Sequence, residues 1–271
     1  MPRGPRFSVI IPTHERPALV QEAVSSVLAQ TINDFEVIVV DDGSPGMPDL
    51  PSDRRVRLIA HEVNLGVSVA RNTGIEAATG QYVCFLDDDD LYTPERLEIA
   101  DEGLVRAPAT ACSKCFVNPH SPSTEWTASE DVRFFMASRW LHVGQLVIRR
   151  EMAPRFDPRL KAAEDHDWAI QLALRVRPWP IDRLGYIVRS NTEPRPPERR
   201  DANLPFEAWS SMLSSRADFF DTRPDLLAWQ WKRLGGKLMP SNRRLARRAF
   251  LNSMTARPSL RTGYHLVRTW V

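Results

Sequence analysis

The sequence predicts an α/β fold with a mostly parallel central sheet flanked by helices, followed by a basic helical appendage. Two observations, the apolar runs that suit strands and the helical stretches between them, predict the sheet. Short β-branched apolar runs alternate with stretches in which apolar residues recur every three to four positions, and this alternation is typical of right-handed β-α-β units. The appendage is predicted from a third observation, which is that no Asp or Glu occurs from Leu226 to Val271.

The first predicted elements are a strand, a helix and two further strands. Phe7–Ile11 is short, apolar and β-branched, as in strands that are buried on both faces. Pro17 suits the first turn of a helix, and a helical apolar stripe continues to Leu28. Phe35–Val40 is predicted as a second buried strand and Val56–Ala60 as a weaker third.

A second helix, a strand and a third helix follow. Residues 66–79 have a helical pattern, and Gly80 is predicted in the left-handed position that often ends a helix. Gln81–Leu86 is the next apolar strand. Thr93 is expected to cap a helix over Pro94–Arg106, since Thr is a favoured N-cap and Pro a favoured first residue.

The pattern loosens after residue 108. Ala109–Val117 and Val143–Arg149 are predicted strands, and Asp165–Val176 is a predicted helix. Residues 193–200 (EPRPPERR) contain three prolines and are predicted to form an extended linker. Helical segments carrying three tryptophans follow it.

These patterns predict two parts. An α/β domain is expected over residues 1–192, with a first half at about 1–107 and a second half at about 108–192. A linker and a helical C-terminal segment are expected over residues 193–271.

Charge is distributed unevenly along the chain. The net charge is +2, but residues 226–271 carry ten Lys or Arg and no acid, which leaves −8 on residues 1–225. This split predicts an acidic catalytic body and a basic appendage that meets an anionic partner.

The sequence also argues against several classes of protein. No apolar run approaches the roughly 18 residues that span a bilayer, and no signal core is recognised, so we expect a cytoplasmic protein. The three cysteines make no disulfide framework. Cys112 and Cys115 match C-x-x-C, but positions three apart in a strand face opposite sides, which favours ordinary half-buried cysteines over a zinc or redox site.

Polar clusters follow three of the predicted strands. They are Pro12–Glu15, Asp41–Ser44 and Asp87–Asp90. Each alone could be a turn or a solvated lead-in to a helix. The carboxyl ends of parallel strands meet at one edge of a sheet, where open α/β folds bind ligands. The three clusters together therefore predict one cleft.

The aspartate run predicts a metal site in that cleft. Mg²⁺ and Mn²⁺ prefer oxygen ligands, and Mg²⁺ commonly binds one or two carboxylates together with substrate phosphates. Gly66 would allow a close approach of the ligand, and the pair Arg71-Asn72 would offer a cation to ribose or phosphate.

Three segments carry a resemblance to a known family. They are residues 8–44 (SVIIPTHERPALVQEAVSSVLAQTINDFEVIVVDDGS), 64–90 (NLGVSVARNTGIEAATGQYVCFLDDDD) and 162–172 (AAEDHDWAIQL). These segments resemble family 2 glycosyltransferases of the GT-A fold, and the resemblance covers roughly residues 7–190. The resemblance implies a nucleotide-diphospho-sugar donor, usually a UDP-sugar, a Mn²⁺ or Mg²⁺ ion, and inversion at the anomeric carbon. The resemblance assigns the donor to the first half of the domain, at about residues 1–107, and the acceptor to the second half, at about residues 108–192.

By position, the resemblance places Pro12, Thr13 and Glu15 against the nucleotide. It places Asp42 at the uracil base and Arg71 near the nucleotide-binding wall.

The resemblance identifies Asp87-Asp88-Asp89 as the family's D-x-D motif. Asp87 would lie at the nucleotide-sugar, Asp88 would contact the ribose or the metal, and Asp89 would be the main metal ligand. Four aspartates in a row leave the register open by one residue.

The pair Glu164-Asp165 resembles the family's E-D motif, in which the aspartate is the general base. Asp165 would take the proton of an acceptor hydroxyl as that oxygen attacks C1 opposite the diphosphate. Apolar surroundings, partly from Trp168, would raise the pKa of this base. His142 and Gly144 are weaker matches on the acceptor side, which also includes Glu164 and Trp168.

Two features near these motifs have simpler explanations. Acids at a helix start also interact favourably with the helix dipole, which would explain Glu164 and Asp165 without chemistry. His166 is either a metal ligand, as in some related enzymes, or a solvent-facing helical residue.

The basic segment predicts an amphipathic helix. Its cationic face is formed by Arg243, Arg244, Arg247 and Arg248, and its apolar face by Leu245, Ala249, Phe250 and Met254. Such a helix either docks on an anionic membrane, which would place the protein peripherally at the inner face, or packs on the catalytic domain. No nucleic-acid recognition motif is present.

Three functions remain open from the sequence. The first is a glycosyltransferase acting on a saccharide or lipid-linked acceptor in surface polysaccharide or glycolipid assembly. The second is a nucleotidyltransferase, which would need a glycine-rich phosphate loop where this chain has PTHERP. The third is a non-catalytic nucleotide-sugar-binding relative, which the intact carboxylates disfavour.

Overall fold

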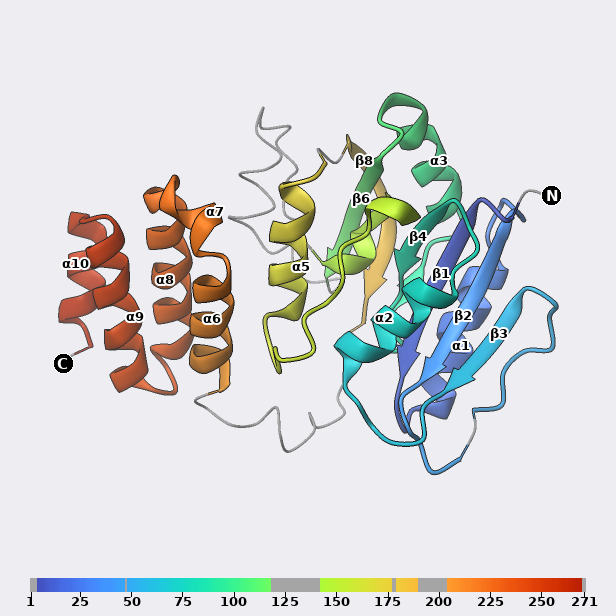
Figure 1. The fold of residues 1–271 in the computed structure, drawn as a ribbon, viewed down its shortest axis with the longest axis horizontal. Helices are drawn as coiled ribbons and strands as arrows, with labels where there is room; N and C mark the ends of the chain where they lie inside the picture. The colour runs from blue at the N-terminus through green and yellow to red at the C-terminus, as the bar shows by residue number, and fades with distance from the viewer. Residues whose placement is uncertain (1–3, 47, 118–141, 177–178, 190–203, 270–271) are drawn as a thin grey trace. The chain divides into compact units, whose positions relative to one another are not determined.

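The computed structural model describes residues 4–46, 48–117, 142–176, 179–189 and 204–269 (Figure 1). The chain divides into two compact units. The first comprises Met1–Met136, Leu141–Pro158 and Trp168–Thr192, and the second comprises Ala137–Trp140, Arg159–Asp167 and Glu193–Val271.

The first unit is built on an eight-stranded sheet with the order β3-β2-β1-β4-β7-β6-β8-β5. Four strands are mutually parallel, as the sequence predicts: β1 (Phe7–Thr13), β2 (Phe35–Asp41), β3 (Val56–Ala60) and β4 (Tyr82–Phe85). β1, β2 and β4 are buried along their whole length, which suits strands covered on both faces, whereas the edge strand β3 carries Arg57 and is partly exposed. Their carboxyl ends therefore lie at one edge of the sheet.

The second half of the sheet mixes directions. Its strands are β5 (Leu91–Tyr92), β6 (Thr110–Val117), β7 (Leu146–Arg149) and β8 (Trp179–Val188). β7 is antiparallel to β4 and β6, β6 is parallel to β8, and β5 is antiparallel to β8. The predicted strand over Val143–Arg149 begins instead with a 3₁₀ turn, η1 (Val143–Gln145).

Helices cover both faces of this sheet. Alternate residues of β1 point to opposite sides, so Phe7, Val9 and Ile11 pack with α1 (Pro17–Leu28) and α3 (Arg96–Arg106). Ile10 faces the other core, which contains α2 (Val67–Ala77) and the part of α5 (Glu164–Ala173) from Trp168 onward.

Gly80 is required for a reason that differs from the prediction. Among the described residues, the glycines with positive φ are Gly43 and Gly66, so Gly80 is not the left-handed end of α2. A Cβ atom at Gly80 would lie 2.8 Å from backbone atoms of Phe7 and Ser8. Glycine here permits close approach to β1.

The predicted Thr93 cap is also wrong. α3 begins at Arg96, its N-cap Glu95 makes no side-chain cap bond, and the Thr93 hydroxyl donates to the Leu184 carbonyl, 3.2 Å away. Thr93 therefore ties β8 to the chain before α3.

Glu36 joins three segments at the opposite end of the sheet from the polar clusters. Its carboxylate accepts hydrogen bonds from the Ser8 hydroxyl (2.7 Å), the Thr79 amide (2.7 Å) and the Arg57 guanidinium (2.8 Å). Burial alone would raise the pKa of Glu36, but these bonds outweigh it and lower the pKa below 4.5.

We expect Glu36→Ala to lower the free energy of unfolding by about 2–4 kcal/mol at pH 7, because buried donors lose their acceptor. Since the folded pKa is depressed, the carboxylate stabilises the fold above the unfolded value of 4.5, and this contribution is lost as pH falls through the folded pKa. Urea unfolding should show that the free energies of unfolding of parent and variant differ less at pH 4 than at pH 7. A difference that grows on acidification would contradict this role.

The second unit is helical in its described part. Its helices are α6 (Leu204–Ser215), α7 (Ala217–Asp221), α8 (Pro224–Leu238), α9 (Arg243–Ala256) and α10 (Leu260–Val267), together with the start of α5. Its core contains Leu234 and Leu238 of α8 with Ala246, Ala249 and Phe250 of α9. The apolar face of the basic helix is thus buried within its own unit.

The described residues also bear on membrane spans and on the cysteines. Within the described ranges, no helix combines the length and apolar character that crossing a bilayer requires. Cys84 is a buried free thiol, whereas the side chains of Cys112 and Cys115 lie outside what the structure describes.

Candidate active site

The polar clusters that follow β1, β2 and β4 meet at one edge of the sheet. Thr13 and Asp41 end β1 and β2 as register partners. The Asp42 amide donates to the Thr13 carbonyl (2.8 Å), and the Thr13 hydroxyl donates to the Asp88 carboxylate (2.8 Å). Segments from three separate parts of the sequence therefore contact one another, as the strand order predicts. Pro12 is buried inside β1.

Arg16 joins two of the aspartates. Its Nη1 atom lies 3.1 Å from Asp88 Oδ1 and 3.1 Å from Asp89 Oδ2. The two carboxylates can therefore reach a single cationic centre. Arg16 was not predicted from the sequence as a site residue, because a basic residue before a helix has no distinctive spacing with acids more than 70 positions away.

A cavity of about 480 Å³ adjoins this cluster. Its walls include Thr13, Glu15, Arg16 and Ser44, and its volume lies in the range of small-molecule sites. Glu15 has φ +54, a left-handed conformation that is uncommon for a residue other than glycine. Its amide donates to the Ser44 hydroxyl (2.8 Å), which links the loop after β1 to the loop after β2.

Asp42 holds the segment that leads into α2. Its carboxylate, 4% exposed, accepts from the amides of Leu65 (3.0 Å) and Gly66 (2.7 Å) and contacts His61 Nδ1 (2.7 Å). Gly66 precedes α2 with φ +94, which favours glycine, and a Cβ there would meet nothing within 4 Å. Asp42 therefore shapes the wall between β2 and α2.

The buried Arg71 forms an ion pair with the partly exposed Asp87. Arg71, on α2, is 2% exposed, and its Nη2 lies 2.8 Å from Asp87 Oδ1. Burial opposes ionisation of Asp87, but the Arg71 guanidinium and His142 outweigh it and hold the pKa of Asp87 well below its usual range. Asp87 is therefore an anion at neutral pH.

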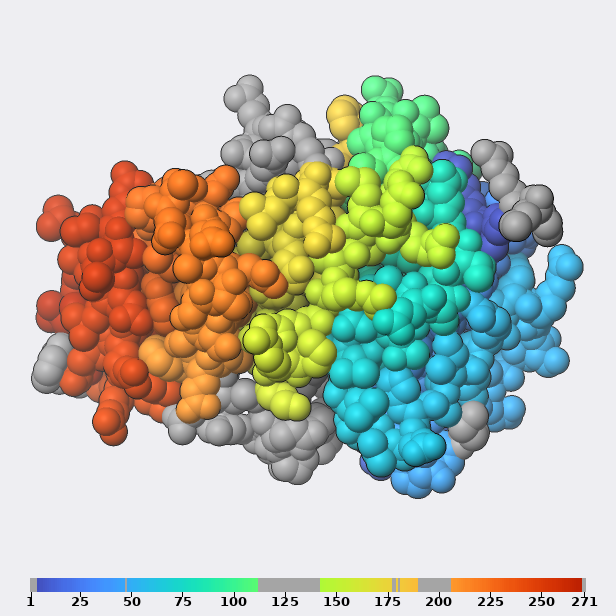
Figure 2. Space-filling view, in the orientation of Figure 1, coloured from blue at the N-terminus to red at the C-terminus, as the bar shows by residue number. Residues whose placement is uncertain are grey.

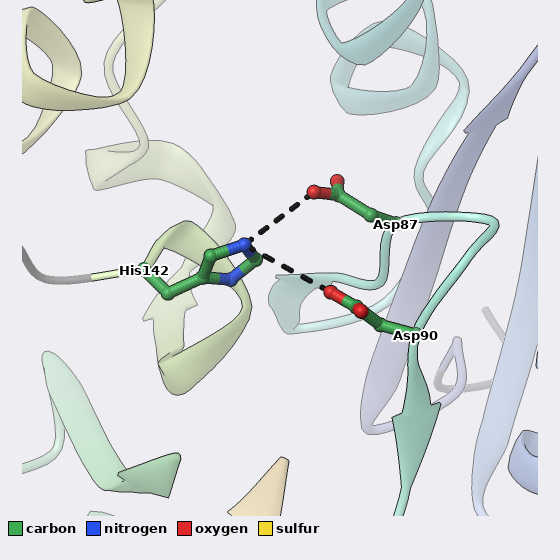
Figure 3. Close-up of side chains that lie close together, drawn as sticks. All are labelled: Asp87, Asp90 and His142. Carbon is green, nitrogen blue, oxygen red and sulfur yellow. Dashed lines mark ion pairs between the residues drawn. The ribbon is translucent and has the colours of Figure 1, made fainter. Parts of the chain in front are cut away.

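Asp87, Asp90 and His142 converge in a second group (Figure 3). One ligand atom from each lies within 4.8 Å of the others, and His142 Nε2 is 3.5 Å from Asp87 and 3.9 Å from Asp90. The Tyr186 hydroxyl donates to Asp90 (2.7 Å) and accepts from the Asp87 amide (3.2 Å). The pairing of Asp90 with His142 was missed from sequence, although Asp90 belongs to the aspartate run.

Asp88 and Asp90 are costly to ionise. Burial raises the pKa of Asp88 to about 6, helped by the charge of Asp89. Burial and the charge of Asp87 raise the pKa of Asp90 to about 7. A cation reduces the electrostatic repulsion between carboxylates in a buried site, so this cluster favours the binding of a cation.

The donor atoms fit a hard divalent cation in two ways. Asp88 and Asp89 offer carboxylate oxygens that already share one cationic nitrogen at 3.1 Å. Asp87, Asp90 and His142 offer two oxygens and one nitrogen. Oxygen sets suit Mg²⁺ and Mn²⁺ alike, whereas a histidine ligand suits Mn²⁺ better.

Two of the predicted acceptor-side residues have packing roles. A Cβ at Gly144 would lie 2.0 Å from the Tyr186 ring, so glycine here lets Tyr186 reach the aspartates. Trp168 is fully buried, stacks on Phe156 (5.3 Å between centroids, 9°) and donates from Nε1 to the Pro154 carbonyl (2.9 Å).

The predicted base lies at the start of α5, in the second unit. Asp165 is partly exposed, next to buried Glu164. Ala163, immediately before the helix, has φ +66, and such conformations are sparsely populated for alanine and persist where surrounding structure enforces them.

Buried polar contacts secure this helix start within the second unit. Arg216 makes two hydrogen bonds to the fully buried Asp167 (2.6 and 2.9 Å). His166 is 4% exposed, with Nε2 2.7 Å from Gln230 Nε2, and stacks on Trp209. The expectation of a solvent-facing His166 is therefore wrong.

Comparison with known proteins adds independent information. The family model described as glycosyl transferase family 2 matches residues 8–156. The uncharacterized glycosyltransferase EpsJ of Bacillus subtilis (strain 168) is 30% identical over 217 residues, which is 69% of this chain and 62% of EpsJ. The chain thus spans less than two thirds of that relative's own length.

Solved structures share the fold at low identity. S. aureus TarS 1-349 in complex with UDP-GlcNAc matches with a TM-score of 0.60 at 18% identity, over 96% of this chain and 91% of that one. The mannosyltransferase PcManGT from Pyrobaculum calidifontis, in complex with GDP-Man and Mn²⁺, matches with a TM-score of 0.62 at 19% identity, over 98% and 79%. The mainly parallel α/β sheet is that of GT-A structures. With more than half of its length matched by the family model, the chain belongs to glycosyl transferase family 2.

Proposed function

We propose that this chain is an inverting glycosyltransferase that moves a sugar from a UDP-sugar to a hydroxyl of a saccharide or lipid-linked acceptor. The observation that carries the proposal is the contact of Thr13 with both Asp42 and Asp88, beside the cavity of about 480 Å³. Carboxylates and a cation at the carboxyl edge of a parallel sheet suit a nucleotide diphosphate. Membership of the family and the nucleotide sugars bound to TarS and PcManGT support the same reading.

The donor is proposed to occupy the first half of the catalytic domain, residues 1–192. Pro12, Thr13 and Glu15 lie against the nucleotide, and Asp42 meets the uracil base. Arg71 and Asp87 form the wall towards α2, where the ion pair keeps both side chains oriented.

Mn²⁺ or Mg²⁺ is the proposed cofactor. Asp89, with Asp88, would hold the ion; Asp87, Asp90 and His142 are the alternative set. A bound ion would act as a Lewis acid that stabilises the charge of the leaving diphosphate. Thr13 holds the Asp88 carboxylate in place, and Arg16 balances the aspartates when no ion is bound.

Arg16→Gln is expected to tighten Mn²⁺ binding about fivefold, because a competing cation worth roughly 1 kcal/mol is removed. Titration followed by electron paramagnetic resonance measures free Mn²⁺ directly. Arg54→Gln, an exposed change of the same charge in the loop before β3, is the control and should leave the affinity unchanged. Weaker binding in Arg16→Gln would show that Asp88 and Asp89 do not hold the ion.

Asp165 is proposed as the general base. It accepts the proton of the acceptor hydroxyl while that oxygen attacks C1 of the sugar, and the bond from C1 to the diphosphate oxygen breaks. Inversion follows from a single displacement. The bonds from Arg216 to Asp167 keep the start of α5 fixed, which orients the base.

Incubation with UDP-sugars and Mn²⁺ tests the function. Release of free UDP by transfer or slow donor hydrolysis supports a glycosyltransferase. Release of pyrophosphate would instead indicate a nucleotidyltransferase, and binding without turnover a non-catalytic relative. We also propose that the enzyme works peripherally at an anionic membrane surface, where a lipid-linked acceptor would reside.

A further inference from the structure

The last helix exposes an apolar stripe. Leu260, Tyr264 and Val267 on α10 are 96%, 63% and 62% exposed. Their spacing of four and three residues places them on one face of the helix. The other face is anchored, since Thr262 is buried and His265 stacks on Phe250 (5.7 Å, 14°). The stripe is therefore held outward by the packing of the helix itself.

Cations border the stripe. Arg257, Arg261 and Arg268 are exposed, and residues 226–271 contain no carboxylate side chain. Burial, followed by repulsion from Lys232, Arg261 and Arg268, lowers the pKa of His265. Positive charge thus accumulates at α10, where an anionic surface would relieve it.

The structure moves the docking surface away from α9. Ala246, Ala249 and Phe250 of that helix are buried in the helical core. Arg247 donates to Thr269, and Arg248 lies over the Phe206 ring at 4.8 Å. α9 therefore keeps most of its apolar side chains from the surface and exposes Leu251 (47%), whereas α10 exposes three large apolar side chains on one face. Atoms of both helices lie at the surface, coloured red in Figure 2.

We propose that the exposed face of α10 docks on an anionic lipid bilayer. Leu260, Tyr264 and Val267 enter the boundary between headgroups and acyl chains, and Arg257, Arg261 and Arg268 face lipid phosphates. Such pairing of apolar and basic residues is what interfacial helices use. A second copy of the same face would bring like charges together, and a nucleic acid would leave the stripe in water.

This inference deepens the proposed function, because it brings the enzyme to the surface where lipid-linked acceptors lie. Vesicle binding is measured without donor or acceptor, so failure of the membrane proposal is distinguishable from failure of glycosyl transfer. The full chain is cosedimented with vesicles of phosphatidylcholine alone, or of phosphatidylcholine mixed with phosphatidylglycerol, at low and high salt.

Two triple variants probe the face, and two probe equivalent residues of the first unit. The α10 variants are Leu260→Ser/Tyr264→Ser/Val267→Ser and Arg257→Gln/Arg261→Gln/Arg268→Gln. The controls remove exposed residues of the same kinds: Val63→Ser/Val105→Ser/Leu174→Ser and Arg54→Gln/Arg106→Gln/Arg183→Gln. Circular dichroism checks that each variant is folded.

We expect the parent to bind the anionic vesicles about tenfold more than the neutral ones. Each α10 triple variant should bind the anionic vesicles about tenfold less than the parent does. The controls should stay within about twofold of the parent. UDP release by donor hydrolysis should be unchanged in the α10 variants. The proposal is overturned if the parent binds both vesicle types equally, or if the control variants lose as much binding as the α10 variants do. It is also overturned if the chain self-associates through the stripe in sedimentation without lipid.

Discussion

Asp165→Asn is expected to retain donor binding and to lose sugar transfer by roughly 10²–10⁴-fold, the range that general base catalysis contributes. Asparagine has nearly the same shape as aspartate but does not accept the proton of an attacking hydroxyl. The bonds from Arg216 to Asp167 should persist in the variant, because neither residue is changed. Calorimetry with UDP measures binding, and initial rates with a saturating acceptor measure transfer.

A matched change separates the role of the base from loss of charge. Asp182→Asn removes one carboxylate from an exposed position of β8 and should transfer at the parent rate. If Asp165→Asn also transfers at near the parent rate, Asp165 is not the base. If it loses donor binding together with transfer, the acid serves the structure of the donor site.

Asp89→Asn is expected to lower transfer by roughly 10²-fold or more at limiting Mn²⁺, because Lewis-acid stabilisation of a leaving group is worth several kcal/mol. Loss of one ligand should raise the Mn²⁺ concentration needed for half-maximal rate. The measurement is the initial rate as a function of Mn²⁺. Asp53→Asn, in the loop before β3, is the control and should leave that dependence unchanged.

The same titration distinguishes the two donor sets. If Asp89 holds the ion, His142→Ala should shift the Mn²⁺ requirement much less than Asp89→Asn does. The opposite order would assign the ion to Asp87, Asp90 and His142, whose two aspartates are three positions apart and therefore do not form a D-x-D pair.

The sequence predicts the first half of the catalytic fold well, for a physical reason. Strands such as Phe35–Asp41 are buried on both faces, so they appear as continuous apolar runs. The meeting of Thr13, Asp42 and Asp88 follows from the same fact, because parallel strands end at one edge.

The remaining features depend on contacts between distant residues. β8 (Trp179–Val188) contains Pro180, Asp182 and Gly185, which interrupt a strand pattern, and it forms because β6 supplies a partner. His166 is buried because α8 places Gln230 opposite it. No local pattern around a histidine at a helix start indicates such a partner.

The most direct test is a crystal structure with UDP and Mn²⁺, with the ion located by anomalous scattering. We expect the ion at Asp89 together with the diphosphate, and the uracil on the Asp42 side of the cavity beside the loops that follow β1 and β2. A nucleotide bound away from the carboxyl ends of β1, β2 and β4 would contradict it.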